Sequence, residues 1–270
     1  MTHPFYKDSK NQTDIHPTAI VDPSAEIGTG VKIGPYSIVD SRVKIGKDTV
    51  IGPHNWLTGK TTIGKRNQIH MGCSIGNIPQ DLKYDGEDTE LIIGDDNIIR
   101  EYCTLNLGTD ETGKSAIGDR NLLMAYVHVA HDCYLGSDII LANSTHIAGH
   151  VTIDSKAIIG GVTAIHQFCR IGSFAMVGAQ SKITRDILPY SLVDGVPAKC
   201  AGMNIIGLKR NDFGQKQIQV IKEAFKILYY RKINRKDALV ELAKLAKGND
   251  ILNYFMDFIE KSSRGIAHKK

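Results

Sequence analysis

The 270-residue chain has no long hydrophobic run. No segment approaches the roughly 18 consecutive apolar residues that a membrane-spanning helix needs. The N-terminal stretch MTHPFYKDSKNQTD is polar and lacks the apolar core of a secretory signal peptide. We therefore expect no integral membrane segment and a cytoplasmic location.

Cysteine is scarce, and the 5 cysteines never form a CxxC pair. Their odd number and wide spacing indicate free thiols in a reducing compartment, with no disulfide framework and no metal site. The formal net charge of +4 permits an acidic partner, but it does not indicate nucleic acid.

What the chain has instead is a repeat of six residues. From Ile15 to Ile183, 29 positions lie at this spacing, and only Asp81, Glu87 and Glu111 among them are not aliphatic. A period of six matches neither the 3.6 of a helix nor the two of an alternating strand. It predicts short strands joined by tight corners, with one aliphatic side chain per strand pointing inward.

Glycine often follows the aliphatic residue, as in Ile27-Gly28 and Ile45-Gly46. We attribute these glycines to the corners, whose backbone geometry glycine tolerates. Stacked coils of such strands form a parallel β-helix, so the main domain is expected to be all-β.

The repeat resembles that of the hexapeptide-repeat proteins, which fold as a left-handed parallel β-helix. The left hand, the three-sided section and the turn of three hexads are implied by this resemblance. Residue n then stacks on residue n+18, about 4.8 Å away. His128 and His146 are 18 residues apart, so they should lie on adjacent coils, one above the other.

The repeat also predicts the domain boundaries. We expect a polar lead-in at 1–14, the β-helix at 15–188, a Pro/Gly-rich linker at 189–213 and a small C-terminal α-helical domain at 214–270. Two lapses in the repeat predict loops at 77–90 and 107–116. In the last segment Ile218, Ile221 and Phe225 share one helical face, and two further helices are expected at 236–246 and 249–261.

The second loop contains a false nucleotide-binding signature. Gly108 to Ser115 satisfy GxxxxGK[ST], but a phosphate-binding loop needs a strand before it and a helix after it. Here the hexads resume at Ile117, and Asp110 and Glu111 would repel a triphosphate. Nucleotide hydrolysis is therefore not expected.

Histidines gather around the stretch MAYVHVAHDC at 124–133. An imidazole titrates near neutral pH, which suits His131 as a general base, and Asp132 beside it could fix its tautomer. The chain has no GxSxG elbow and no cysteine in a nucleophile motif. The simplest chemistry is direct transfer, in which the base deprotonates a hydroxyl or amine that attacks an activated acyl group.

Three segments resemble the bacterial UDP-N-acetylglucosamine acyltransferase family, which opens lipid A synthesis. They are IPQDLKYDGE (78–87), NLLMAYVHVAHDC with LANSTHIAGHVTIDSKAIIGGVTAIHQFCRIG (121–133 and 141–172), and NIIGLKR (204–210). The resemblance implies a homotrimer with active sites between neighbouring subunits and no permanently bound cofactor. It also implies transfer of an (R)-3-hydroxyacyl chain from the 4'-phosphopantetheine thioester of acyl carrier protein to the 3-position of UDP-N-acetylglucosamine.

The same resemblance implies roles for individual residues. His131 is the general base, Asp132 supports it, and the N–H of Gly149 is the oxyanion donor. The residues implied at the sugar and diphosphate are Gln80, Asp81, Lys83, His128, His150, His166 and Gln167. Asn204 and Arg210 are implied to hold the uridine and phosphates, although the chain departs from the family motif at Ile206 and Asn211. Met176 and Ala179 are candidates for the floor of the acyl groove.

The sequence leaves alternative functions open. An acyltransferase of the same fold acting on an amino sugar nucleotide would also need a base such as His131, and the acyl chain length is not readable. A zinc carbonic anhydrase-like β-helix needs three imidazoles around one metal. His128, His146 and His150 are the candidates, without the metal spacing of that family. A catalytically silent scaffold is disfavoured by the intact His-Asp and loop motifs.

Overall fold

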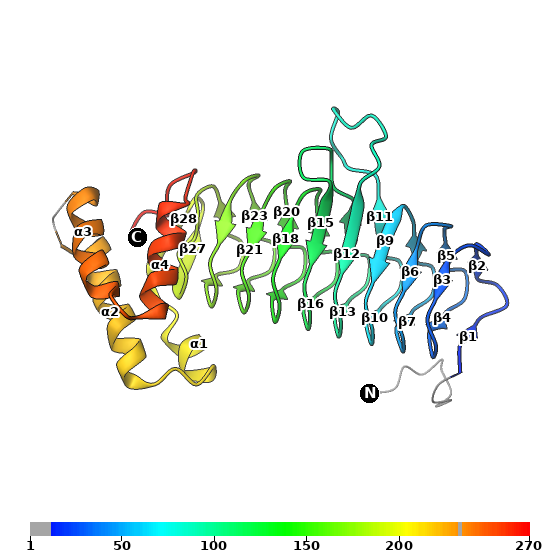
Figure 1. The fold of residues 1–270 in the computed structure, drawn as a ribbon, viewed down its shortest axis with the longest axis horizontal. Helices are drawn as coiled ribbons and strands as arrows, with labels where there is room; N and C mark the ends of the chain where they lie inside the picture. The colour runs from blue at the N-terminus through cyan, green and yellow to red at the C-terminus, as the bar shows by residue number, and fades with distance from the viewer. Residues whose placement is uncertain (1–11, 232–233) are drawn as a thin grey trace.

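The computed structural model describes residues 12–231 and 234–270, so most of the expected lead-in lies outside the described residues. Short strands wind into a long prism, and helices gather at its C-terminal end (Figure 1). Among the helices of the described chain, none is both long enough and apolar enough to cross a bilayer.

Three sheets form the sides of the prism within the described residues. The first consists of β1 (Asp14–Ile15), β4 (Lys32–Ile33), β7 (Val50–Ile51), β10 (Gln68–Ile69), β13 (Ile98–Ile99), β16 (Leu122–Leu123), β19 (Ile140–Leu141), β22 (Ile158–Ile159), β25 (Met176–Val177), β27 (Ser191–Gly195) and β28 (Ala198–Met203). The second consists of β2 (Ile20–Val21), β5 (Ile38–Val39), β8 (Trp56–Leu57), β11 (Ser74–Asn77), β14 (Thr104–Asn106), β17 (His128–Val129), β20 (His146–Ile147), β23 (Ala164–Ile165) and β26 (Lys182–Ile183). The third consists of β3 (Glu26–Ile27), β6 (Lys44–Ile45), β9 (Lys60–Ile63), β12 (Glu90–Ile93), β15 (Lys114–Ile117), β18 (Tyr134–Leu135), β21 (Thr152–Ile153) and β24 (Arg170–Ile171).

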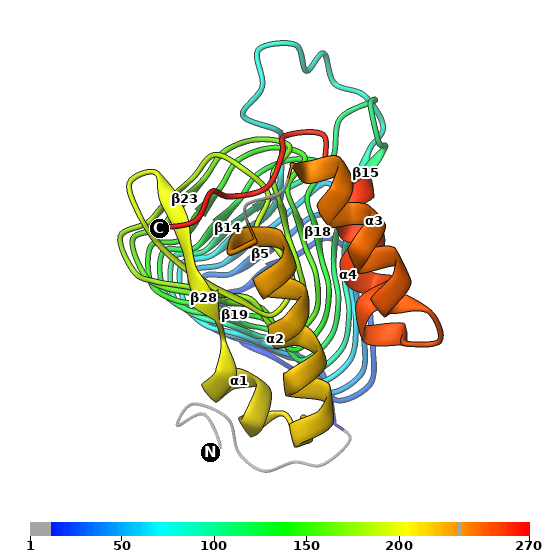
Figure 2. The same cartoon turned by 90° about the vertical axis from the view of Figure 1, so that its left-hand side faces the viewer.

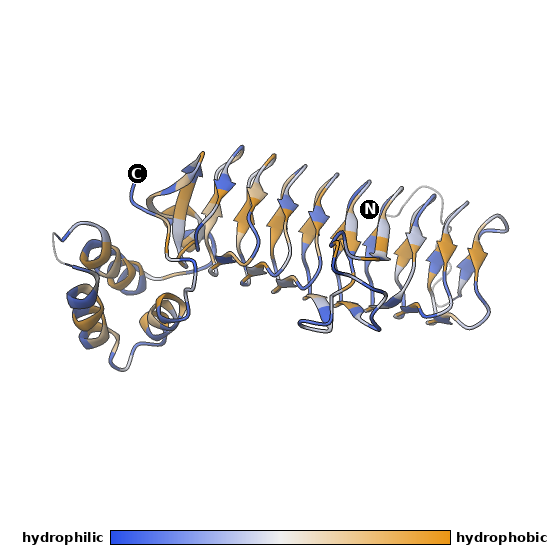
Figure 3. Ribbon diagram, turned by 90° about the horizontal axis from the view of Figure 1, so that it is seen from above, coloured by the Kyte–Doolittle hydropathy of each residue, from blue (hydrophilic) through white to orange (hydrophobic). Residues whose placement is uncertain are grey.

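The residue repeat sets the core of the prism. Neighbouring side chains of a strand point to opposite faces, and many coil strands pair a hydrophobic residue with a hydrophilic one (Figure 3). The inward aliphatics stack in register, so that Leu123 pairs with Leu141 and Leu141 with Ile159, all three fully buried. The predicted β-helix with one inward aliphatic per strand is confirmed.

The glycines that follow the inward aliphatics have a different role from the expected one. Residues with positive φ lie three positions after the aliphatic, and most are not glycine, as at Tyr36 (φ 58) and Asp132 (φ 58). A Cβ added to Gly46 would lie 2.5 Å from the carbonyl carbon of Gly64 on the next coil. Glycine is needed at this place because two coils approach closely, and not because the corner requires it.

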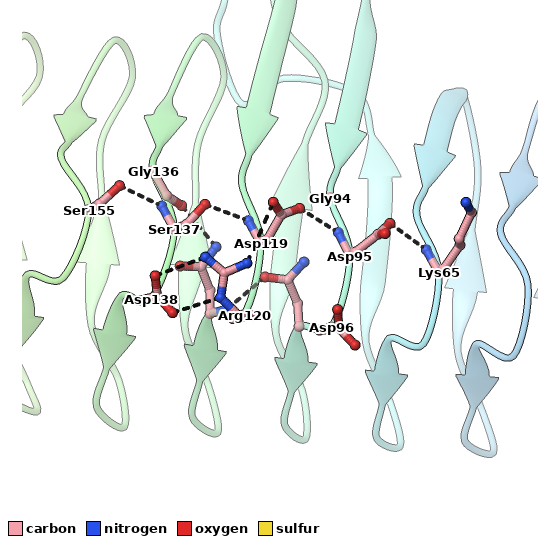
Figure 4. A network of polar contacts seen from close by, with 12 residues as sticks. Lys65, Gly94, Asp95, Asp96, Asp119, Arg120, Gly136, Ser137, Asp138 and Ser155 are labelled. Atoms are coloured by element: carbon pink, nitrogen blue, oxygen red, sulfur yellow. Dashed lines mark hydrogen bonds and ion pairs between the residues drawn. The ribbon is translucent and has the colours of Figure 1, made fainter.

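A ladder of side chains satisfies the backbone at one corner of the prism (Figure 4). The N–H of Lys65 donates to the carboxylate of Asp95 at 2.8 Å, and the N–H of Asp95 donates to the carboxylate of Asp119 at 2.7 Å. The N–H groups of Asp119 and Ser137 likewise donate to hydroxyls one coil further on, each at 3.0 Å. Each rung satisfies a corner N–H that no backbone carbonyl of the described residues accepts.

Both expected loops leave the prism at the corner between the second and third sheets. One joins β11 to β12 and the other joins β14 to β15, and they rise side by side above the coils (Figure 1). The strands on either side stay in register, because β11 pairs with β14 and β12 with β15. The hydroxyl of Thr89 ties the loops together by donating to the carbonyl of Gly108 at 2.6 Å.

Residues 189–213, expected to be a linker, contain β27, β28 and the short helix α1 (Ile205–Arg210). β27 extends the first sheet beside β25, and β28 pairs with it antiparallel. This hairpin lacks the six-residue spacing, so the repeat alone could not reveal it.

The helical domain comprises α2 (Gln215–Tyr229), α3 (Arg235–Ala246) and α4 (Asp250–Glu260). These helices lie across the end of the coils, as the view along the prism shows (Figure 2). The hydroxyl of Tyr254 in α4 donates to the carboxylate of Asp154 at 2.6 Å and accepts from the N–H of Ser173 at 2.8 Å. These bonds anchor α4 to the last coils.

The substitution Gly46→Ala tests the glycine explanation. The new methyl would overlap the backbone of the next coil, so we expect about 1–3 kcal/mol of destabilisation, measured as a lower midpoint of thermal unfolding. Gly214→Ala is the matched control, because a Cβ there meets its nearest atom at 3.7 Å. An unchanged midpoint for Gly46→Ala would contradict the explanation.

Candidate active site

One corner of the prism brings the predicted catalytic residues together. The chain turns from the second sheet to the third after β17, β20 and β23, and at these turns Asp132, His150 and Phe168 have φ values of 58, 60 and 64. These three residues are 18 apart, so each occupies the same left-handed position on successive coils. The two loops leave the same corner on the preceding coils, which places them directly beside it.

His131 and Asp132 form a close pair at this corner. Nδ1 of His131 lies 2.7 Å from Oδ2 of Asp132. The His131 side chain is 13% exposed, whereas the Asp132 side chain is fully buried. The carboxylate therefore holds the imidazole from inside while the ring keeps access to the surface.

The buried carboxylate of Asp132 is saturated with hydrogen-bond donors from the second loop. Its Oδ1 accepts from the N–H of Thr109 at 3.0 Å and from the hydroxyl of Thr112, and its Oδ2 accepts from the Thr109 hydroxyl at 2.7 Å. Burial alone would raise the pKa of the Asp132 carboxyl, but these donors and His131 outweigh it and lower the pKa. Asp132 is therefore an anion at neutral pH.

His150 lies against the pair from the next coil. Its ring meets the ring of His131 edge-on, with centroids 5.1 Å apart, and stacks on Phe168 at 4.5 Å. Its Nε2 lies 3.6 Å from Oδ2 of Asp132 and 3.4 Å from the carboxylate of Glu111. Two carboxylates thus face His150.

Gly149 leaves room for the imidazole of His131. A Cβ at residue 149 would lie 2.5 Å from Cε1 and 2.6 Å from Nε2 of that ring. Within the described residues, the N–H of Gly149 has no hydrogen-bond acceptor. The backbone of Gly149 therefore lies against the imidazole, and its N–H has no acceptor among the described residues.

A pocket of ≈ 360 Å³ opens above the pair. Its lining residues are Gln80, Asp81, Lys83, Tyr84, Glu87, Thr109, Asp110, Glu111, His131, His150, Gln167 and Phe168. The three residues that interrupt the six-residue repeat, Asp81, Glu87 and Glu111, all line it. The breaks in the repeat therefore mark the pocket.

His128 stands beside this pocket on β17. Its Nδ1 lies 2.7 Å from the hydroxyl of Thr104, and it pairs in register with His146, as the repeat predicted. Burial, with smaller contributions from His146 and His131, lowers the pKa of His128. His128 is therefore neutral at pH 7 and can donate or accept a hydrogen bond.

Several candidate residues do not line the pocket of this single chain. The ring of His166 contacts the carbonyl of Gln167 at 3.1 Å, and Met176 and Ala179 lie on and just after β25. The Asn204 side chain caps α1 by accepting from the N–H of Gly207 at 3.0 Å, and it donates to the carbonyl of Phe174 at 2.9 Å. Arg210 ends the same helix.

Sequence reasoning missed some residues around the pair. Tyr84, Glu87, Thr109, Asp110, Glu111 and Phe168 line the pocket, and Thr112 binds Asp132. The breaks in the repeat could have indicated Glu87 and Glu111. The threonines gave no signal, because their contacts depend on how the second loop folds back.

The structure weakens two of the other functions considered. The described residues near enough to share a metal are His131, Asp132 and His150, and not the three imidazoles His128, His146 and His150. Within that group, Asp132 already accepts four hydrogen bonds, two from Thr109, one from Thr112 and one from His131. The strand β15 (Lys114–Ile117) begins within the phosphate-loop signature, at its Lys114, where a helix would be needed.

Comparisons with known proteins identify the family. The family model described as "Udp N-acetylglucosamine O-acyltransferase; Domain 2" matches residues 186–267, and the bacterial transferase hexapeptide model matches residues 24–59. An acyl-[acyl-carrier-protein]--UDP-N-acetylglucosamine O-acyltransferase from Alkalilimnicola ehrlichii is 55% identical over 255 residues, which cover 94% of this chain and 99% of that protein.

Solved structures agree with this result. The UDP-N-acetylglucosamine acyltransferase of Francisella novicida matches with a TM-score of 0.92 and 38% identity over 94% of each chain. That of Moraxella catarrhalis matches with a TM-score of 0.91 and 43% identity, over 94% of this chain and 99% of the other. The protein is a hexapeptide-repeat acyltransferase with the predicted left-handed β-helix and α-helical domain. Within that class it belongs to the UDP-N-acetylglucosamine O-acyltransferase family.

The substitution Gly149→Ala tests the packing around the imidazole. Its methyl would displace the His131 ring, so we expect transfer activity to fall by roughly 10² or more, as when a catalytic base is removed. Gly161→Ala is the matched control, because it holds the same hexad position and its Cβ meets only the carbonyl of Asn143 within 3.0 Å. Full activity in Gly149→Ala would show that the ring does not depend on this glycine.

Proposed function

We propose that this protein transfers an (R)-3-hydroxyacyl chain from acyl carrier protein to the 3-hydroxyl of UDP-N-acetylglucosamine. The single observation that carries the proposal is the His131–Asp132 pair, with its 2.7 Å contact, at the base of a polar pocket. We further propose that it works in the cytoplasm, where its buried free cysteines would stay reduced.

His131 acts as the general base. An ionised carboxylate only accepts hydrogen bonds, so Asp132 leaves the shared proton on Nδ1 and the lone pair on Nε2. Nε2 removes the proton of the sugar hydroxyl as that oxygen attacks the thioester carbon. When the tetrahedral intermediate collapses, the imidazolium returns the proton to the departing phosphopantetheine thiolate. Asp132 stabilises the imidazolium between these steps.

Gly149 supplies the oxyanion donor. Its N–H has no acceptor among the described residues and lies beside the ring of His131. A donor with no acceptor among the described residues is available to the negative oxygen that forms only in the tetrahedral intermediate. The base and the donor then act on neighbouring atoms of the same intermediate.

The polar pocket receives the sugar. Gln80, Asp81 and Lys83 reach it from the first loop, and His150 and Gln167 reach it from the coils. Carboxylate, amide and ammonium groups match the hydroxyls and amide of a glucosamine ring. His128, His166, Asn204 and Arg210 complete the proposed contacts to the nucleotide at a subunit boundary.

The acyl groove is proposed to come from a second copy of the chain. The outward side chains of the first sheet form a half-buried apolar strip of Leu122, Ile140, Ile158 and Met176, stacked in register. This strip lies on the first sheet, whereas the His131 corner joins the second and third sheets. Only a neighbouring subunit can bring such a strip to that corner, which supports a homotrimer with Met176 and Ala179 at the groove floor.

The reaction and its base are tested together by following mass-tagged 3-hydroxyacyl chains from acyl carrier protein to UDP-N-acetylglucosamine. We expect product with the wild type and a loss of about 10²–10⁴ in His131→Ala, the range for a general base. His54→Ala is the control, because this corner histidine stacks on Tyr36 far from the pocket. Transfer only to the 3-amino analogue of the acceptor would contradict the proposed substrate.

The composite site is tested by mixing two inactive variants. His131→Ala lacks the base and Met176→Trp blocks the groove, so each alone should be nearly inactive. Trimers assembled from both chains by unfolding and refolding them together should recover about a quarter of the wild-type sites by random assortment. No recovery from folded mixed trimers would place base and groove on the same chain.

A further inference from the structure

We propose that Thr112 is a positioning residue for this reaction, because its hydroxyl holds Oδ1 of Asp132 and thereby the imidazole of His131. The inference rests on the proposed role of His131 as the base. It assigns a function to the loop at 107–116, whose phosphate-loop signature binds no phosphate in the proposed reaction.

Asp132 is held from two sides. His131 contacts Oδ2 at 2.7 Å, and the loop supplies three donors, which are the N–H and hydroxyl of Thr109 and the hydroxyl of Thr112. A carboxylate offers about four acceptor sites, so this one is fully occupied. Each of these donors restrains the orientation of the carboxylate against Nδ1 of His131.

The hydroxyl of Thr112 has a choice of acceptors. It lies close to Oδ1 of Asp132 and 3.0 Å from the carbonyl oxygen of Lys114. A hydroxyl has one proton to donate, and a charged carboxylate is the stronger acceptor. The proton therefore goes to Asp132. The hydroxyl of Thr109 is directed in the same way, because it accepts from the N–H of Glu111 at 3.4 Å and so points its own proton to Oδ2.

Thr112 differs from Thr109 in its access to the substrate. Thr109 lines the pocket and also holds Asp132 through its backbone N–H, whereas Thr112 is not part of the pocket wall. A change at residue 112 therefore reaches the reaction either through the carboxylate or through the fold of the loop, and not by contact with the substrate in the pocket. Loss of this donor leaves Oδ1 with only the bond from the N–H of Thr109, so the carboxylate is held less firmly against Nδ1 of His131.

The experiment compares kcat and KM for Thr112→Val and Thr112→Ser. We expect kcat to fall roughly tenfold in Thr112→Val, the size of one charge-assisted hydrogen bond, with KM unchanged. Thr112→Ser keeps the hydroxyl and should restore most of kcat. Thr49→Val is the matched control. The buried Thr49 hydroxyl donates to the carbonyl of Gly64 at 2.9 Å, and both residues lie several coils away from Asp132. This substitution should leave kcat unchanged.

A double-mutant cycle separates positioning from loop stability. If Thr112 acts through Asp132, then Thr112→Val should cause no further loss in an Asp132→Ala background. An equal loss in both backgrounds would mean that the hydroxyl only maintains the loop, and this would overturn the proposal. Wild-type kcat in Thr112→Val would overturn it as well.

A spectroscopic readout keeps this result independent of the substrate. The Nδ1 proton of His131, bonded to a carboxylate, should give a downfield proton resonance that disappears in Asp132→Ala. We expect Thr112→Val to broaden or shift this resonance, and Thr112→Ser to preserve it. If transfer to UDP-N-acetylglucosamine fails but the resonance responds in this way, the proposed function is wrong and the positioning role stands. A resonance unaffected by Thr112→Val would refute the positioning role alone.

Discussion

Parallel hydrogen bonding between successive coils is the constraint on which the rest of the structure depends. Each strand must pair in register with the strand above it, as Leu123 does with Leu141. Register fixes not only the inward aliphatics but also every corner residue, because the corners follow at constant spacing. Asp132, His150 and Phe168 therefore stand in a column. A catalytic group placed at one corner gains neighbours from the coils on either side without any change in the path of the chain.

The same constraint explains where the chain can be lengthened. An insertion within a strand would shift every following residue out of register. An insertion at a corner leaves the strands paired, as β11 with β14 and β12 with β15 show. The loops at 77–90 and 107–116 leave the prism at the corner next to His131. They therefore form walls of the pocket while the strands of the coil stay paired.

The coil and the His131–Asp132 pair could be predicted from sequence because both depend on local spacing. The aliphatics at intervals of six predicted the strands, and His131-Asp132 are adjacent in sequence as well as in space. The donors from Thr109 and Thr112 could not be predicted, because a loop of this composition has no period that fixes its path. The hairpin of β27 and β28 was missed for the related reason that it lies beyond the repeat. The breaks in the repeat at Asp81, Glu87 and Glu111 marked the loops, and they also marked residues that line the pocket.

The N–H of Gly149, which has no acceptor among the described residues, belongs to the second residue after the inward Ile147. At the corner between the third and first sheets, the side chain at the equivalent position of the next coil accepts such an N–H on four successive coils, as Asp119 does for Asp95 and Ser137 for Asp119. At the catalytic corner, the next coil offers Gln167, whose side chain lines the pocket. No such ladder forms at this corner, because the N–H groups of His131, Gly149 and Gln167 have no side-chain acceptor among the described residues. One coil earlier the position equivalent to Gly149 is His131, and the missing side chain of Gly149 is what lets that imidazole lie against the backbone. The proposed base and the proposed oxyanion donor thus occupy the same hexad position on consecutive coils of one corner.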